Sequence, residues 1–209
     1  MTDNATTLAD RIARIERLES ELLRKVVASA EKKAAVSQTD MFVLGALRRT
    51  LAQAQGFRDL LAARNFPCAA GILRMQIDTA MRVNALRLVA DPDEACHDVL
   101  GGKPFNKLKD ATGNKLTDAY LRQKLAEDHP WVNAVYEQTS DFIHLSGRHL
   151  YNSISTLDEE TRTVRFVISG KDPPRPDEDY FEIVDAFFEA TKVVGVLMLG
   201  YFQARALPA

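Results

Sequence analysis

The sequence predicts an all-α fold: an up-and-down bundle of about five long helices, with a small β-hairpin appended near residues 153–168. Apolar residues recur at three- and four-residue steps through long stretches of the chain, which is the spacing of one helix face. The turns between the first stretches are short, which is typical of antiparallel neighbours. With 209 residues, 46% of them hydrophobic and 27% charged, the chain suits a single domain spanning residues 1–209.

The first two helices are predicted from residue 8 to about 35 and from about 40 to 65. The first carries its apolar residues on one face and Arg, Glu and Lys on the other. Thr39 or Asp40 is expected to cap the second, because short polar side chains accept hydrogen bonds from the free N–H groups of a first turn.

The third helix and the middle of the chain follow from their Pro and Gly residues. Pro67 suits the first turn of a helix that ends near residue 91. A short helix is expected within residues 91–102, then an ordered basic loop with one helical turn (103–115) and a second short helix (116–129). A further long helix is expected over residues 131–145, with Gly147 as its C-cap.

The end of the chain predicts a hairpin, a linker and a last helix. Val164, Phe166 and Ile168 alternate with Arg165 and Val167, as expected of a strand. A lone hairpin is marginal in water, so we expect this one to lean on the bundle. The stretch KDPPRPDED is read as a rigid linker, after which Asp177 caps a helix from about 178 to 206.

Charge and hydropathy narrow the class of protein. The formal net charge of −2 gives no overall basic field for nucleic acid. The longest apolar run, VVGVLMLGYF (193–202), is about half of the ~20 residues that span a membrane, so we expect a buried core helix. No leader-like apolar segment begins the sequence, and Cys68 and Cys96 match no metal spacing. We therefore expect a soluble, cytoplasmic protein without contact with a membrane.

A charged stripe on the third helix is the first candidate site. Arg74, Asp78 and Arg82 are four residues apart and share one face, among apolar neighbours. One interpretation is an ion-pair ladder with acids on neighbouring helices. The other is a clamp for an anion, in which Asp78 orients the two guanidinium groups.

The segment TSDFIHLSGRHLYN (139–152) is the second candidate. On a continuous helix Asp141 and His144 touch, and a carboxylate bonded to an imidazole raises its basicity, which suits a general base. Arg148 and His149 follow at the predicted helix end. The competing interpretation is that His144 lies at a helix C-terminus and His149 at the surface.

Two further patterns are weighed beside these. The loop 103–115 is basic, and Lys103 and Lys107 are predicted to form the rim of a pocket or simply to face solvent. Glu94 with His97, and Asp141 with His144, are carboxylate–imidazole pairs at a spacing of three, the pattern of di-metal bundles. Because the first pair sits in a short segment, no cofactor and no metal ligand is assigned.

Nucleophiles are weaker candidates. Ser146 precedes a glycine but lacks the strand–turn–helix setting of a hydrolase elbow. Cys68 and Cys96 are interpreted as buried structural thiols.

Four stretches in order, GILRMQIDTAMRVNAL, GKPFNKLKD, KLTDAYL and YEQTSDFIHLSGRH, resemble a family of uncharacterised bacterial all-helical proteins, to which no activity is attached. The resemblance covers about residues 65–152. A looser similarity is to HEPN-like helical bundles, which include defence ribonucleases with four to six residues between an Arg and a following His. Arg122 with His129 has that spacing, whereas His144 precedes Arg148.

The sequence therefore predicts a polar pocket inside the bundle that binds an anionic ligand, a nucleotide or an RNA phosphate, in a defence-related role. Arg74, Asp78 and Arg82 line one wall. The other wall is formed by Asp141, His144, Arg148 and His149, and Lys103 and Lys107 form the rim. If the protein is an enzyme, His144 is the acid or base and Asp141 orients it. The alternatives are a non-enzymatic interaction protein, expected to be a homodimer, and a di-metal bundle.

Overall fold

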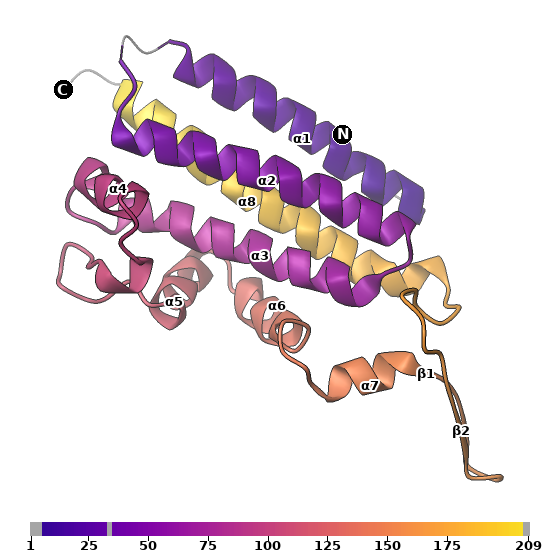
Figure 1. The fold of residues 1–209 in the computed structure, drawn as a ribbon. Helices are drawn as coiled ribbons and strands as arrows, with labels where there is room; N and C mark the ends of the chain where they lie inside the picture. The colour runs from indigo at the N-terminus through magenta and orange to yellow at the C-terminus, as the bar shows by residue number, and fades with distance from the viewer. Residues whose placement is uncertain (1–5, 33–34, 207–209) are drawn as a thin grey trace.

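The computed structural model describes residues 6–32 and 35–206, and these form eight α-helices and one two-stranded sheet. Four helices are long: α1 (Leu8–Ala30), α2 (Gln38–Ala62), α3 (Phe66–Asn84) and α8 (Phe181–Ala206). They lie side by side, with α8 against both α1 and α3 (Figure 1). The all-α prediction is confirmed at this level.

Shorter elements cover the far side of α3. They are α4 (Pro92–Leu100), α5 (Asp118–Asp128) and α6 (Trp131–Ser140), joined through the 3₁₀ turns η1 (Ala85–Arg87) and η2 (Phe105–Lys107). Then come α7 (Gly147–Ser153), β1 (Ile154–Asp158), β2 (Thr163–Phe166) and η3 (Asp177–Tyr180). The fifth long helix of the predicted bundle is absent from the described residues, because the helix expected over 131–145 ends at Ser140.

The chain leaves the helix through a tightened turn. The N–H of Phe142 donates to the carbonyl of Thr139 at 3.1 Å, and that of Ile143 donates to the carbonyl of Ser140 at 3.0 Å, so both bonds reach back three residues. Such bonds satisfy the last carbonyl groups of a helix as it ends. Ser146 then caps α7 by accepting from the N–H of Arg148, so Gly147 begins a helix instead of closing one. The predicted C-cap was wrong.

The helix starts follow capping rules. Ser37 is the N-cap of α2, and Asp40 at the third position bonds back to it, which is a capping box. The cap predicted at Thr39 or Asp40 was therefore two to three residues too late. Asn65 caps α3, and Pro67 lies in its first turn as predicted.

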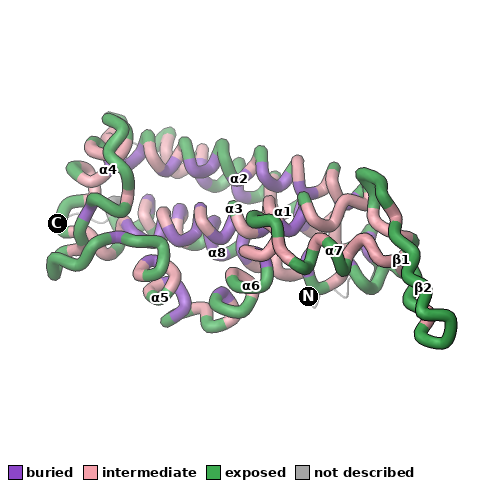
Figure 2. The backbone as a smooth tube through the Cα atoms, turned by 60° about the horizontal axis from the view of Figure 1, so that its bottom comes forward, coloured by how far each residue is buried: buried purple, intermediate pink, exposed green. Residues whose placement is uncertain are grey.

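The core fills the space between the four long helices. The rings of Phe57 and Phe187 stack with their centres 4.0 Å apart. The predicted core helix is confirmed, since Val194 and Met198 of α8 are fully buried. Gly195 lets α8 approach α1, because a Cβ there would lie 3.1 Å from a methyl carbon of Leu22. Buried residues follow the inner faces of the long helices in Figure 2. Within the described residues, no helix combines the length and apolarity needed to cross a membrane.

The predicted hairpin is present but stands apart. β1 and β2 pair antiparallel, with Leu157 opposite Val164. Both strands project from the body of the molecule, beyond α7 (Figure 1). The expectation that the hairpin leans on the bundle was wrong: its apolar side chains Leu157, Val164 and Phe166 are exposed.

Candidate functional site

The charged stripe of α3 meets side chains from α2 and α5. Arg82 Nη1 lies 3.1 Å from Asp78 Oδ1, and Arg82 Nη2 lies 2.9 Å from Asp118 Oδ1. On the other side, Arg49 Nη2 of α2 lies 3.9 Å from Asp78 Oδ2. Asp78 therefore sits between two guanidinium groups, as predicted, but the second is Arg49 from α2 in place of Arg74.

Arg49 is held in a fixed orientation by buried polar groups. Its Nε donates to Thr79 Oγ1 at 3.0 Å. With the Gln53 amide oriented so that its nitrogen faces Gln76 and Thr79, its oxygen accepts from Arg49 Nε at 3.1 Å. The terminal nitrogens stay accessible, because 45% of the side chain is exposed. Such an arginine presents donors without a large further loss of side-chain entropy.

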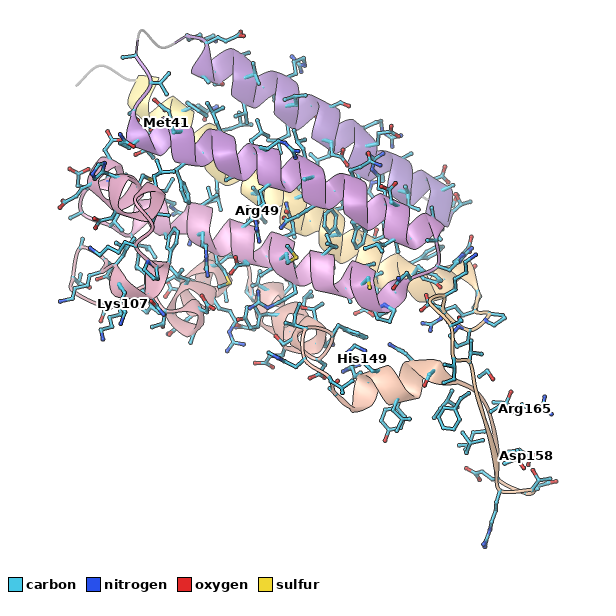
Figure 3. The ribbon with its side chains drawn as sticks, in the orientation of Figure 1. Met41, Arg49, Lys107, His149, Asp158 and Arg165 are labelled. Atoms are coloured by element: carbon cyan, nitrogen blue, oxygen red, sulfur yellow. The ribbon has the colours of Figure 1, made fainter. Side chains whose placement is uncertain are left out.

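These residues line a groove of about 360 Å³ between α2, α3 and α4. Arg49, Asp78, Thr79 and Arg82 form its polar part. Its apolar part is formed by Met41, Phe42, Gly45, Ala46, Val83, Val99 and Leu100. Figure 3 shows Met41 and Arg49 along α2. Met41 and Leu100 are exposed large apolar side chains. A concave site with an apolar wall and a few convergent polar groups is the usual form of a small-molecule site.

The electrostatics of the groove leave polar groups incompletely satisfied. Burial raises the pKa of Asp78, and the attraction of Arg82 and Arg74 offsets this only in part. Arg82 Nη1 is shielded from solvent and has no hydrogen bond of good geometry, although Asp78 lies nearby.

Arg74 lies on a different part of the α3 face. Its guanidinium carbon is 3.4 Å from the ring centre of Tyr136 on α6, and that of Arg122 is 4.9 Å from the same ring. Arg122 also pairs with Glu137 at 3.2 Å. Burial lowers the pKa of Arg74, and among the described residues no carboxylate lies within ion-pair distance of it. The stripe is thus split between a groove and an Arg–Tyr–Arg stack.

The basic loop is ordered, as predicted, and adjoins the groove. Phe105 packs against Phe42 and lies 5.2 Å from the guanidinium of Arg82. Lys103 pairs with Asp98 at 2.6 Å. Lys107 is exposed on the η2 turn below α4 (Figure 3). Neither lysine lines the groove. The rim that both were expected to form stays a prediction.

The second predicted wall is at the surface. Asp141 pairs with Arg148 at 3.0 Å, and each side chain is about half exposed. The expected Asp141–His144 contact is replaced by this pair, because the helix that would have aligned them ends at Ser140. His144 is exposed, and its carbonyl oxygen lies 3.2 Å from His149 Nε2. His149 packs edge-on against Phe142 at 5.8 Å.

Two other grooves have the wrong charge for an anion. One of about 470 Å³ contains Arg148 and Arg175, but three acids share its lining: Glu178, Asp179 and Glu182. The other, of about 610 Å³ between α3 and α8, contains Arg87, Asp91 and Asp93. Arg87 is already paired with Asp128 at 3.2 Å. The two predicted walls therefore do not enclose one pocket: Arg148 lines a different groove from Asp78 and Arg82.

Metal and nucleophile chemistry find little support in the geometry. The described residues contain no group of three or more His, Cys, Asp or Glu side chains able to hold a metal ion. Glu94 and His97 lie on α4, and Asp141 and His144 follow α6. Ser146 Oγ donates to the carbonyl of Asp141 and, as the cap of α7, accepts from the N–H of Arg148, so this hydroxyl is already engaged in two hydrogen bonds. Cys96 is buried, as predicted, and burial raises the pKa of its thiol to about 11. Cys68 is exposed, so the prediction of a buried thiol was wrong there.

The sequence alone missed Arg49, Thr79 and Gln53. Arg49 follows another arginine on an amphipathic helix and looks like a solvent-facing residue. The available signal was the i, i+4 pair Arg49–Gln53 beside Thr50, since polar residues on a buried face need partners. The HEPN-like pair also finds other roles: Arg122 contacts Tyr136 and Glu137, and His129 is the C-cap of α5.

Comparisons with known proteins give no match: no protein-family model, no curated protein and no solved structure is significantly similar to this chain. The function is therefore argued from the residues of the groove.

Proposed function

We propose that the protein binds a small organic anion, of the size of a mononucleotide, in the groove between α2, α3 and α4. The observation that carries the proposal is the pair of fixed arginines, Arg49 and Arg82, at the polar part of a groove with an apolar wall. A volume of about 360 Å³ lies in the range of small-ligand sites, about 300–1,000 Å³.

The two parts of the groove suit two parts of such a ligand. Guanidinium groups bind phosphate or carboxylate oxygens through paired N–H donors. Arg49 and Arg82, whose side chains are both partly exposed and line the groove, supply these donors. Phe42, Met41 and Leu100 offer an apolar surface to a base or another flat group.

Asp78 limits the affinity and couples it to pH. Its carboxylate competes with the ligand for both arginines. Because burial raises its pKa, protonation is easier here than for an exposed aspartate. A bound anion raises the pKa of Asp78 further, so anion binding should strengthen as the pH falls. This is a binding role, and no reacting group is assigned within the groove.

A cytoplasmic location is part of the same proposal. Cys68 and Cys96 are both free thiols in the structure, which suits a reducing compartment.

The experiment is a thermal-shift screen of the full chain with mononucleotides, inorganic phosphate, nucleosides and short single-stranded RNA. We expect an upward shift with mononucleotides, a smaller one with phosphate alone, and none with nucleosides. Arg49→Ala should abolish the shift. Arg48→Ala is the matched control, because Arg48 is the adjacent exposed arginine on α2 and does not line the groove.

Two results contradict the proposal. One is no shift with any anion. The other is an equal loss in Arg49→Ala and Arg48→Ala, which would make the response a general effect of charge. A shift with RNA alone that survives Arg49→Ala would likewise reject this groove.

A further inference from the structure

The segment from residue 143 to residue 171, called the arm below, concentrates exposed apolar side chains. It contains α7, β1 and β2 and projects from the bundle (Figure 1). Eight of the fourteen exposed large apolar side chains among the described residues lie in it: Ile143, Leu145, Leu150, Tyr151, Leu157, Val164, Phe166 and Ile168. Leu145 is 94% exposed and Ile168 is 89% exposed. Such a contiguous apolar surface marks an interaction site.

The arm is also incomplete as a sheet. β1 and β2 pair only with each other among the described strands, so each has one free edge. A two-stranded ribbon is at best marginally stable in water, and an exposed edge is a template for pairing with another chain. The main contacts of β1 are with β2 and α7, and the apolar side chains of the hairpin stay exposed, so the bundle leaves this surface largely uncovered. A partner is therefore needed to bury this surface.

The charges of the hairpin point to a second copy of the same chain. The three acids Asp158, Glu159 and Glu160 lie at its tip, where Arg162 offsets one of them, whereas Arg165 and Lys171 follow toward its root. The charges of residues 158–171 cancel. Glu159, Glu160, Arg165 and Lys171 form no ion pair within the described part of the chain. Figure 3 shows Asp158 near the tip and Arg165 nearer the root.

A two-fold contact between identical patches uses this separation of charge. When two arms lie antiparallel, the acidic tip of each faces the basic root of the other. A uniformly acidic or basic partner would meet like charge at one end of the arm. The apolar area is also adequate, because each arm carries eight exposed large apolar side chains, of which Leu145 and Ile168 are almost wholly exposed. Two arms together then reach the ~1,000 Å² of a specific interface.

We propose that the arms of two copies of this chain pair antiparallel in a homodimer, with Glu159 and Glu160 of one copy against Arg165 and Lys171 of the other. This contact is separate from the groove of α2, α3 and α4 and holds whether or not the groove binds an anion.

Charge reversal tests it with the full chain. The tip variant carries Glu159→Lys and Glu160→Lys, and the root variant carries Arg165→Glu and Lys171→Glu. In either variant alone, the tip and the root carry net charges of the same sign, so the dissociation constant of the dimer should rise at least ten-fold. In a mixture, the basic arm of the tip variant meets the acidic arm of the root variant, and heterodimers should form.

The readout is sedimentation equilibrium, with Leu23→Lys as the control. Leu23 is an exposed leucine on α1, in the half of that helix away from the arm. We expect twice the chain mass of 23.3 kDa for the wild type and the control, the chain mass for each variant, and the doubled mass for the mixture. A monomeric wild type overturns the proposal. So does a dimer unaffected by either variant, or a mixture that stays monomeric although both variants are folded by circular dichroism.

Discussion

The charged face of α3 and the segment 139–152 contain the same kinds of side chain, yet the fold treats them differently. Asp78 and Arg82 are held among α2, α3 and α5, and each is about three-quarters or more shielded from solvent. Asp141 and Arg148 belong to neighbouring turns of one segment and are about half exposed. A dense run of polar residues is therefore not a binding site by itself. Packing of several elements around the charges is what fixes them.

The largest contrast is expected in stability. Arg82→Ala leaves Asp78 and Asp118 without their shared cation, and Asp78 is mostly buried. We expect a loss of about 2 kcal/mol in the free energy of unfolding, less than for a fully buried pair because Arg82 is partly exposed. Arg148→Ala breaks a pair at the surface and should cost ~0.5 kcal/mol or less. Urea denaturation of both variants measures the two losses in the free energy of unfolding. Equal losses would show that the two ion pairs do not differ in their contribution to stability.

The next effect concerns the stack on Tyr136. Tyr136→Leu removes the ring between Arg74 and Arg122 and should cost about 1 kcal/mol, the scale of a partly desolvated cation–π contact. Tyr136→Phe keeps the ring and is the matched control, expected to stay within ~0.5 kcal/mol of the wild type. If the two variants melt alike, the hydroxyl and not the ring carries the interaction.

Asp78→Asn should act on binding and on the pH dependence of stability. Removing the competing carboxylate is expected to tighten anion binding about three- to ten-fold at pH 7. A folded-state pKa above the unfolded value of ~3.9 means that this carboxyl stabilises the fold below ~3.9 and loses that contribution as the pH rises through the folded value. The stability of Asp78→Asn relative to the wild type should therefore increase from pH 4 toward neutral.

Titration calorimetry and urea denaturation at several pH values check both parts. Weaker binding by Asp78→Asn would show that the carboxylate positions the arginines more than it competes for them.

The smallest effect is expected at the residue that the sequence favoured as a base. His144 is exposed. His144→Ala should change stability by less than ~0.5 kcal/mol and leave anion binding within two-fold. A loss of ligand binding in this variant, with an unchanged fold, would return the site to the segment 139–152.

The long helices were predictable from the sequence because their apolar periodicity extends over many turns and their starts carry capping residues. The charged stripe was found for the same reason, since four-residue spacing on a long helix fixes a shared face. Arg49 was not found, because its role depends on how α2 lies against α3, which no local pattern encodes. The helix predicted over 131–145 ends at Ser140, and Ser146 caps a new helix six residues on, so the apolar spacing extended the prediction too far. The hairpin was found, but its position away from the bundle depends on packing that the strands themselves do not specify.

The most direct test of the central contrast is an NMR titration that follows the arginine Nε–H signals while AMP is added. If the groove binds the anion, the signals of Arg49 and Arg82 should show saturable shifts, and those of Arg48 and Arg148 should not move. Equal, unsaturated drifts of all four would show nonspecific attraction. Saturable shifts at Arg148 alone would contradict anion binding in the groove and place the ligand at the segment 139–152.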